Sequence, residues 1–367
     1  MNSHSSLHLE PVQPPQAGPA MPAEARVETR PILIVPYMWI GDFVRCHTVV
    51  RVLKERWPHR PVDLLSTTLC APLVDYMPGV RKAIIWDLPR KRIAFARHLG
   101  LARLIEAEGY GSALIMPRTW KSALAPSLAG IPERTGFIGE ARFGLINDWR
   151  RGEKALPRMV DRCAMLALPP GATLPARWPE PQLVVGPDEV AAWRRANKVS
   201  DAPAVVMAPG AVGPSKRWSY FAEAARTLAT AGIDVWVVGG PGEKDAATAI
   251  VAMGGARVRD MTGTDLRQAI VAMAAANVAV SNDSGLLHVA AALGTPSIGI
   301  FGPTSPYHWA PLNPLAAIIE TRTEVACRPC HKPVCRVEHH RCMRDIAIDD
   351  VVAATRQALA QTGAAAP

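Results

Sequence analysis

Short, almost wholly apolar runs recur along the chain, each followed by glycine, proline or small polar residues. Continuous apolar runs of four or five residues are typical of parallel strands that are buried on both faces. They predict strands at residues 32–35, 62–65, 113–116, 204–207, 234–238, 278–281 and 297–300. Helical patterns follow most of them, the first from about Asp42 to Trp57, where Pro58 ends it. This alternation predicts an α/β fold with parallel sheets.

A Pro-rich stretch at residues 168–187 (LPPGATLPARWPEPQLVVGP) interrupts the series and indicates a linker. With 367 residues, two domains of ordinary size are expected. We therefore predict two Rossmann-like, doubly wound domains, at residues 31–180 and 181–367, facing a central cleft. Residues 1–30, rich in Pro, Ala, Ser and Glu, are predicted to form a disordered tail.

The pattern also bears on location. No stretch approaches the roughly 18 uninterrupted apolar residues of a membrane helix, and the amino terminus has no positive segment followed by an apolar core. A soluble, cytoplasmic protein is expected.

Positive charge is concentrated in the first half of the chain. The formal net charge is +9, and residues 31–170 contain 21 Lys and Arg against 12 Asp and Glu. This half is expected to meet an anionic partner, such as nucleic acid, an acidic membrane surface or a phosphorylated lipid, unless it is an ordinary basic surface. Aromatic residues make up only 6% of the chain and show no Arg/aromatic stacking pattern, which disfavours nucleic acid.

Candidate chemistry lies just after the strands, where ligands bind in open α/β sheets. The segment 282–288 (NDSGLLH) follows one strand and opens a helix, so Ser284 is a candidate N-cap. The positive end of the helix dipole and the free amides from Gly285 onward suit a phosphate, to which His288 could donate a hydrogen bond. In the simpler alternative, Asp283 and Ser284 only cap the helix.

Three further residues occupy strand ends. Asp42, at a helix start, is either a general base or a cap. Lys216, in the loop 209–218, can neutralise a leaving diphosphate, or is an ordinary surface cation. Glu243, after the strand at 234–238, can accept hydrogen bonds from a ribose, or only closes a turn.

The seven cysteines divide into two groups. Cys46, Cys70 and Cys163 stand singly in apolar or helical surroundings and are expected in the core. The others have metal-like spacing, and two interpretations remain open, a structural Zn²⁺ site or a reduced Cys-rich loop packed against the second domain. They are Cys327, Cys330, Cys335 and Cys342.

Four segments resemble the ADP-heptose:lipopolysaccharide heptosyltransferases of glycosyltransferase family 9, type II in particular. They are 36–44 (PYMWIGDFV), 114–148 (LIMPRTWKSALAPSLAGIPERTGFIGEARFGLIND), 209–218 (PGAVGPSKRW) and 282–309 (NDSGLLHVAAALGTPSIGIFGPTSPYHW). The resemblance implies the two-domain GT-B fold, with the acceptor bound by the first domain and the nucleotide sugar by the second.

By this resemblance Asp42 is the catalytic base, Lys216 contacts the diphosphate and Glu243 the ribose. The donor turn comprises Asp283, Ser284, Gly285, Leu286 and His288. The implied reaction moves heptose, with inversion, from ADP-L-glycero-β-D-manno-heptose to the heptose of a lipid A–Kdo core. The anionic acceptor would meet a basic face with Arg118, Lys121, Arg134 and Arg142, and the enzyme would lie peripherally on the inner face of the inner membrane.

No D-x-D motif occurs, so Lys216 and the helix terminus are expected to do the work of a metal, and no cofactor is expected. Alternatives are another GT-B glycosyltransferase, a nucleotide-sugar epimerase of the same architecture, or a non-catalytic basic module that binds lipid A or nucleic acid. Asp42 together with His288 favours catalysis.

Overall fold

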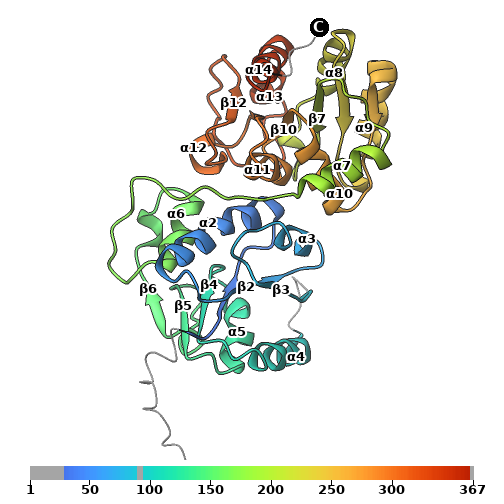
Figure 1. Ribbon diagram of the computed structural model, residues 1–367. Coiled ribbons are helices and arrows are strands. Elements are labelled where there is room, and N and C mark those ends of the chain that lie inside the picture. Colours follow the sequence, from blue (N-terminus) through green and yellow to red (C-terminus); the bar gives the residue numbers. More distant parts are fainter. Residues whose placement is uncertain (1–28, 89–93, 364–367) are drawn as a thin grey trace, which may run out of the picture.

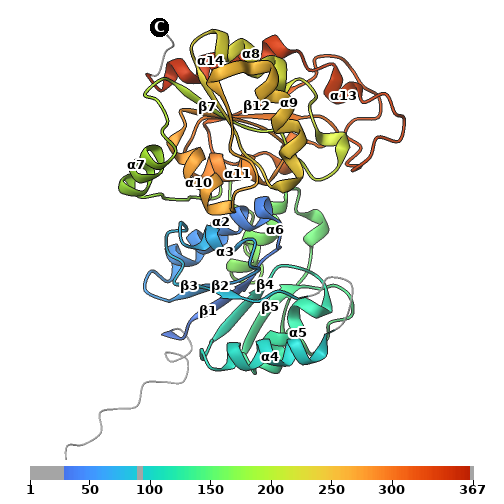
Figure 2. The same cartoon turned by 90° about the vertical axis from the view of Figure 1, so that its right-hand side faces the viewer.

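A computed structural model describes residues 29–88 and 94–363. The predicted tail at residues 1–30 therefore lies almost wholly outside the described residues. Two six-stranded sheets form the framework (Figures 1 and 2). The first has strands β1 (Ile32–Val35), β2 (Val62–Ser66), β3 (Lys82–Ile85), β4 (Ser112–Ile115), β5 (Glu133–Phe137) and β6 (Asp148–Arg150). The second has β7 (Ala204–Ala208), β8 (Asp234–Val237), β9 (Val258–Asp260), β10 (Val278–Asn282), β11 (Ser297–Phe301) and β12 (Ala316–Glu320).

The two sheets have the same topology. Their strand orders are β3-β2-β1-β4-β5-β6 and β12-β11-β10-β7-β8-β9, and their adjacent strands pair in parallel. Each order reverses once, between β1 and β4 in the first sheet and between β7 and β10 in the second. Such switch points open a crevice at the carboxyl ends of the strands. The predicted pair of doubly wound α/β domains is confirmed.

Helices cover both faces of each sheet. In the first domain they are α2 (Ile40–Arg56), α3 (Ala71–Val74), α4 (Phe95–Glu106), α5 (Trp120–Leu128) and α6 (Met159–Ala164). In the second they are α7 (Pro187–Ala196), α8 (Phe221–Thr230), α9 (Lys244–Gly254), α10 (Leu266–Ala275), α11 (Gly285–Ala292), α12 (Pro306–Trp309), α13 (Arg341–Arg344) and α14 (Ile348–Gln361). Among the described residues no helix is long and apolar enough to span a bilayer.

The core continues across the domain boundary. One apolar cluster joins the inner faces of both sheets through α2 and α11, while separate clusters fill the outer face of each sheet. In Figure 1, α2, α3 and α6 lie on the side of the first sheet that faces α10 and α11. The chain crosses between the domains after residue 167 in an extended segment that ends at α7, and the boundary predicted at residue 180 lies in this segment. The shared apolar core thus keeps the switch points of the two sheets facing each other.

Candidate functional site

Asp42 lies in the first turn of α2, directly after the β1 loop. The N-cap of α2 is Trp39, so the helix begins two residues earlier than predicted. Asp42 therefore belongs to the helix and does not cap it. The Asp42 carboxylate accepts a hydrogen bond from Arg45, one turn later. Burial raises the pKa of Asp42, as does Asp283 of the second domain, whereas Arg45 and Lys216 lower it. Groups from both domains thus set the charge of this carboxyl.

Lys216 and Asp283 form a second ion pair, contributed by the second domain. Lys216 ends the short 3₁₀ turn after β7, and its Nζ lies 2.7 Å from Oδ2 of Asp283, which directly follows β10. Thr304, in the loop after β11, donates to the same oxygen at 2.7 Å. Three strand ends therefore converge on Asp283, and the two ion pairs of the site, Asp42–Arg45 and Lys216–Asp283, come from opposite domains.

Asn282 ties the Lys216 loop to the end of β10. Its side-chain Nδ2 donates to the carbonyl of Pro209 at 2.7 Å, and its Oδ1 accepts from the backbone N–H of Trp218 at 3.1 Å. These bonds grip the loop on both sides of Lys216. Sequence reasoning assigned no role to Asn282, Thr304 or Arg45. For Arg45 a signal existed, because it is a charged residue among apolar ones, three positions after Asp42.

The amino termini of α2 and α11 meet at two glycines. A Cβ on Gly285 would lie 2.7 Å from Cβ of Ile40, and one on Gly41 would lie 2.8 Å from Cδ2 of His288. Ser284 occupies the predicted N-cap position of α11 but accepts no capping hydrogen bond among the described residues. The first backbone amides of a helix have no intrahelical partner, and the helix dipole is positive there. This junction therefore suits an anion.

His288 is buried in the same junction. Its Nε2 lies 2.8 Å from Nη2 of Arg45. A guanidinium can only donate, so Nε2 accepts this bond. Burial, and then the charges of Arg45 and Lys216, hold the pKa of His288 well below its usual value, which keeps the ring neutral. The sequence suggested that His288 donates to a phosphoryl oxygen, but in this arrangement only Nδ1 is free to donate.

Glu243 and Leu286 complete the predicted donor residues. Glu243 ends a 3₁₀ turn after β8, and its side chain covers Gly210, where an added Cβ would lie 2.7 Å from it. The Glu243 carboxylate therefore stands beside the β7 loop, at the edge of the sheet that also carries Lys216. Leu286 is partly buried and packs against the central core.

The four cations predicted to bind the acceptor divide into two pairs. Arg142 is only 2% exposed, and its guanidinium donates to the carbonyls of Pro117 and Phe137. Arg134 donates to the carbonyl of Leu145 at 2.8 Å. Arg142 therefore shapes the segment after β5 from within, which corrects its assignment to a basic face, whereas Arg134 is partly exposed and its place in the acceptor site stays a prediction.

Arg118 and Lys121, the other pair, lie at the switch point of the first sheet. Both follow β4, and the Arg118 side chain is 47% exposed, with an ion pair to Glu153 at 3.0 Å. Accessible positive charge therefore remains beside the crevice of the first domain.

The cysteines expected in the core, Cys46, Cys70 and Cys163, are buried. Cys327 is exposed and Cys342 buried, with Cys330 and Cys335 between these extremes. Over residues 29–88 and 94–363, no group of three or more His, Cys, Asp or Glu side chains is placed to hold a metal ion.

The segment that contains Cys330 packs on the donor-side loops. The backbone N–H of Cys330 donates to the carbonyl of Pro303 at 3.0 Å, and Ser215 donates to the carbonyl of Pro333 at 3.1 Å. Ser215 directly precedes Lys216. The Cys-rich segment, although distant from the site in sequence, therefore packs against the loop that contains Lys216.

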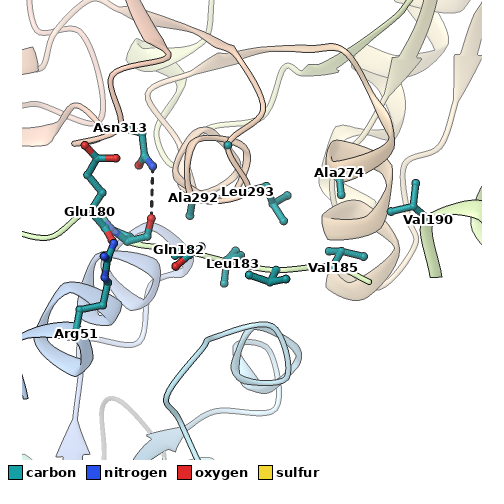
Figure 3. A pocket seen from close by; sticks show the side chains of 13 residues that line it. Arg51, Glu180, Gln182, Leu183, Val185, Val190, Ala274, Ala292, Leu293 and Asn313 are labelled. Carbon is teal, nitrogen blue, oxygen red and sulfur yellow. Dashed lines mark hydrogen bonds between the residues drawn. The ribbon is translucent and has the colours of Figure 1, made fainter. Parts of the chain in front are cut away.

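A cavity of about 490 Å³ lies elsewhere on the domain boundary (Figure 3). It is bounded by the interdomain segment, by Arg51 of α2 and by the carboxyl end of α11. Since α11 has eight residues, this end is roughly 12 Å from the amino terminus that faces Arg45. The cavity therefore lies at the side of the domain boundary where the chain crosses between the domains. It does not include the residues of the two ion pairs.

Comparisons with known proteins agree on one family. A model described as glycosyltransferase family 9 (heptosyltransferase) matches residues 98–340. The chain is 35% identical over 308 residues to lipopolysaccharide heptosyltransferase 2 of Escherichia coli K12, across 80% of this chain and 88% of that protein. It is 32% identical to lipooligosaccharide heptosyltransferase 2 of Haemophilus ducreyi, across 90% and 99%. The solved structure of E. coli ADP-heptose LPS heptosyltransferase II matches with a TM-score of 0.79 and 32% identity, across 91% of this chain and 99% of that one.

Proposed function

The chain belongs to glycosyltransferase family 9, the heptosyltransferases, and on this premise we propose that it transfers heptose from an ADP-heptose to the heptose of the lipopolysaccharide inner core. The family and the GT-B fold expected from the sequence are confirmed. This proposal rests mainly on one observation. Two ion pairs, Asp42–Arg45 in the first domain and Lys216–Asp283 in the second, lie at the two switch points, which face each other.

The acceptor hydroxyl is activated by Asp42. A base in this position takes the proton as the oxygen attacks the anomeric carbon from the face opposite the leaving group, so the configuration inverts. The start of α2 and Arg45 both favour the ionised carboxylate that this step needs. The donor is ADP-L-glycero-β-D-manno-heptose.

The departing diphosphate is stabilised by the second domain. Lys216 supplies a point charge, and the amides at Gly285 and Leu286 supply hydrogen bonds at the positive end of α11. Asp283, which accepts a hydrogen bond from Thr304, holds Lys216 in place, and Glu243 binds the ribose. Arg118 and Lys121 face the phosphate groups of the lipid A–Kdo–heptose acceptor.

One assay tests the reaction itself. Purified protein is incubated with ADP-heptose and a Kdo-lipid A acceptor that carries one heptose, and ADP release is measured. We expect release only with this acceptor, because the base acts on its heptose hydroxyl. The same acceptor without heptose is the matched control. Equal ADP release with both, or turnover of other nucleotide sugars in place of ADP-heptose, would contradict the assignment.

Contact with the inner membrane is the second part of the proposal, and α4 supplies its surface. Phe95 and Leu99, four residues apart on one helix face, are 58% and 37% exposed. Arg97 and Arg103 are exposed on the same helix. Figure 1 shows α4 on the part of the first domain remote from the second. Apolar side chains among cations suit an anionic lipid surface.

Replacing Phe95 and Leu99 by Ser should weaken binding to vesicles that contain phosphatidylglycerol by about tenfold or more. Burial of each apolar side chain in the bilayer contributes favourable transfer free energy, and Ser lacks most of this contribution. Co-sedimentation measures this. Turnover of a delipidated acceptor should not change. Met253→Ser, at a similarly exposed apolar position of α9, is the control. Equal binding of the double variant and wild type would remove α4 from the contact.

A further inference from the structure

Arg45 is a buried charge at the domain boundary. It lies one turn after Asp42 in α2, and its side chain is 9% exposed. Besides its bond to Asp42, Nη2 contacts Nε2 of His288 at 2.8 Å and donates to the carbonyl of Trp309 at 3.0 Å. The guanidinium carbon lies 5.2 Å from the centre of the Trp309 ring. The first domain supplies one partner, and the second domain supplies the other two.

This arrangement holds one orientation of the guanidinium fork. Its hydrogen bonds use Nη1 and Nη2, while Nε is buried without a hydrogen-bond partner among the described residues. A buried cation is costly unless it is paired, and Asp42 is the charged partner in direct contact. His288 accepts through a neutral nitrogen, so it orients the fork without changing the charge of the pair.

We propose that Arg45 is the positioning residue of the catalytic base: it orients Asp42 and keeps it charged, and it is itself locked from the second domain by His288 and the Trp309 carbonyl. The inference rests on the proposed function, in which Asp42 takes the acceptor proton. Because the two locking bonds cross the boundary, the base is fully prepared only when the domains are together.

Other groups around Asp42 do not replace Arg45. The titratable and charged groups that face it from the neighbouring elements are Tyr37, Cys163, Lys216, Asp283 and, through Arg45, His288. Asp283 opposes ionisation of Asp42. Lys216 favours it, but this lysine is paired with Asp283 and serves the diphosphate in the proposed reaction. A bound diphosphate adds negative charge that raises the pKa of Asp42, so the positive charge of Arg45 is needed most in the donor complex.

The test is the pH dependence of kcat for Arg45→Met and Arg45→Lys. Asp42 acts as a base only when ionised, and loss of Arg45 raises its pKa, so the acid limb of the profile moves to higher pH. For Arg45→Met we expect a shift of about one to three units, as found for a carboxylate beside an arginine. The rate lost at low pH returns in part at high pH. Arg45→Lys keeps the charge and should lie between Met and wild type.

ADP binding, measured by calorimetry, shows whether the donor site of each variant is folded, and it should stay within about twofold of wild type. A loss of kcat by the same factor at every pH, or an unshifted acid limb, would overturn the role of Arg45. If Arg45→Met does not fold, the Arg45→Lys profile decides by the same criterion. Asp42→Asn separates the two proposals. If it retains turnover, both fail; if it is inactive while Arg45→Met has an unshifted limb, only this inference fails.

Discussion

Asp42→Asn is expected to lower kcat by about 10²–10⁴-fold, because general base catalysis contributes that much and the amide cannot take the acceptor proton. Asn keeps the size of the side chain and can still accept the hydrogen bond from Arg45. ADP affinity should be unchanged or slightly higher, since removing a negative charge near Lys216 does not disfavour an anion. Initial rates at saturating substrates and calorimetric ADP titrations measure the two effects separately.

The control for this variant is Asp188→Asn. Asp188 is also an aspartate in the first turn of a helix, α7, but it is exposed. Its replacement should leave kcat unchanged. Turnover of Asp42→Asn within a few-fold of wild type would remove Asp42 as the base, whatever its effect on stability.

Lys216→Met should weaken ADP binding by about 10–100-fold, the range for loss of one charge-assisted hydrogen bond, and should lower kcat as charge grows on the leaving group. The ion pair adds a second cost. Without Lys216, the carboxylate of Asp283 faces the diphosphate, and the neutral Thr304 hydroxyl is the side-chain partner that it keeps among the described residues. The double variant Lys216→Met/Asp283→Asn should therefore bind ADP better than Lys216→Met alone.

Arg at position 216 should restore only part of the affinity, because its planar fork does not reproduce the compact ammonium. Arg217→Met is the matched control. Arg217 is the neighbouring cation, exposed, and its Nε donates to the carbonyl of Ala211 within the same loop. An ADP titration of Lys216→Met that coincides with that of wild type would exclude Lys216 from the diphosphate site.

The sequence by itself determined the central strands and the positions of candidate site residues at helix starts after these strands. The seven predicted strands, from residues 32–35 to 297–300, all exist within one or two residues of the predicted bounds. They are visible because inner parallel strands are buried on both faces and become continuous apolar runs. Asp42 and Ser284 could also be placed at helix starts, because helix termini depend on local residue types.

The edge strands β3, β6, β9 and β12 could not be predicted in this way. They lie at the edges of the sheets, and most of their residues are partly buried or exposed. Their runs are therefore short and mixed, and what makes them strands is pairing with a neighbour that is already in place. β5, which contains Glu133 and Arg134, was missed for a similar reason.

Only the tertiary structure decided which charges belong together. Arg142 and Arg45 are both arginines of the first half of the chain, yet one anchors a loop from within and the other joins Asp42 to His288. The segment that contains Cys330 packs against the loop that contains Lys216, although 114 positions separate these two residues in the sequence. Apolar periodicity and capping act between residues close in sequence, whereas the Lys216–Asp283 ion pair joins residues far apart in the chain. The Arg45–His288 bond and the pKa of Asp42 depend on distances across a boundary that forms only when both domains have folded.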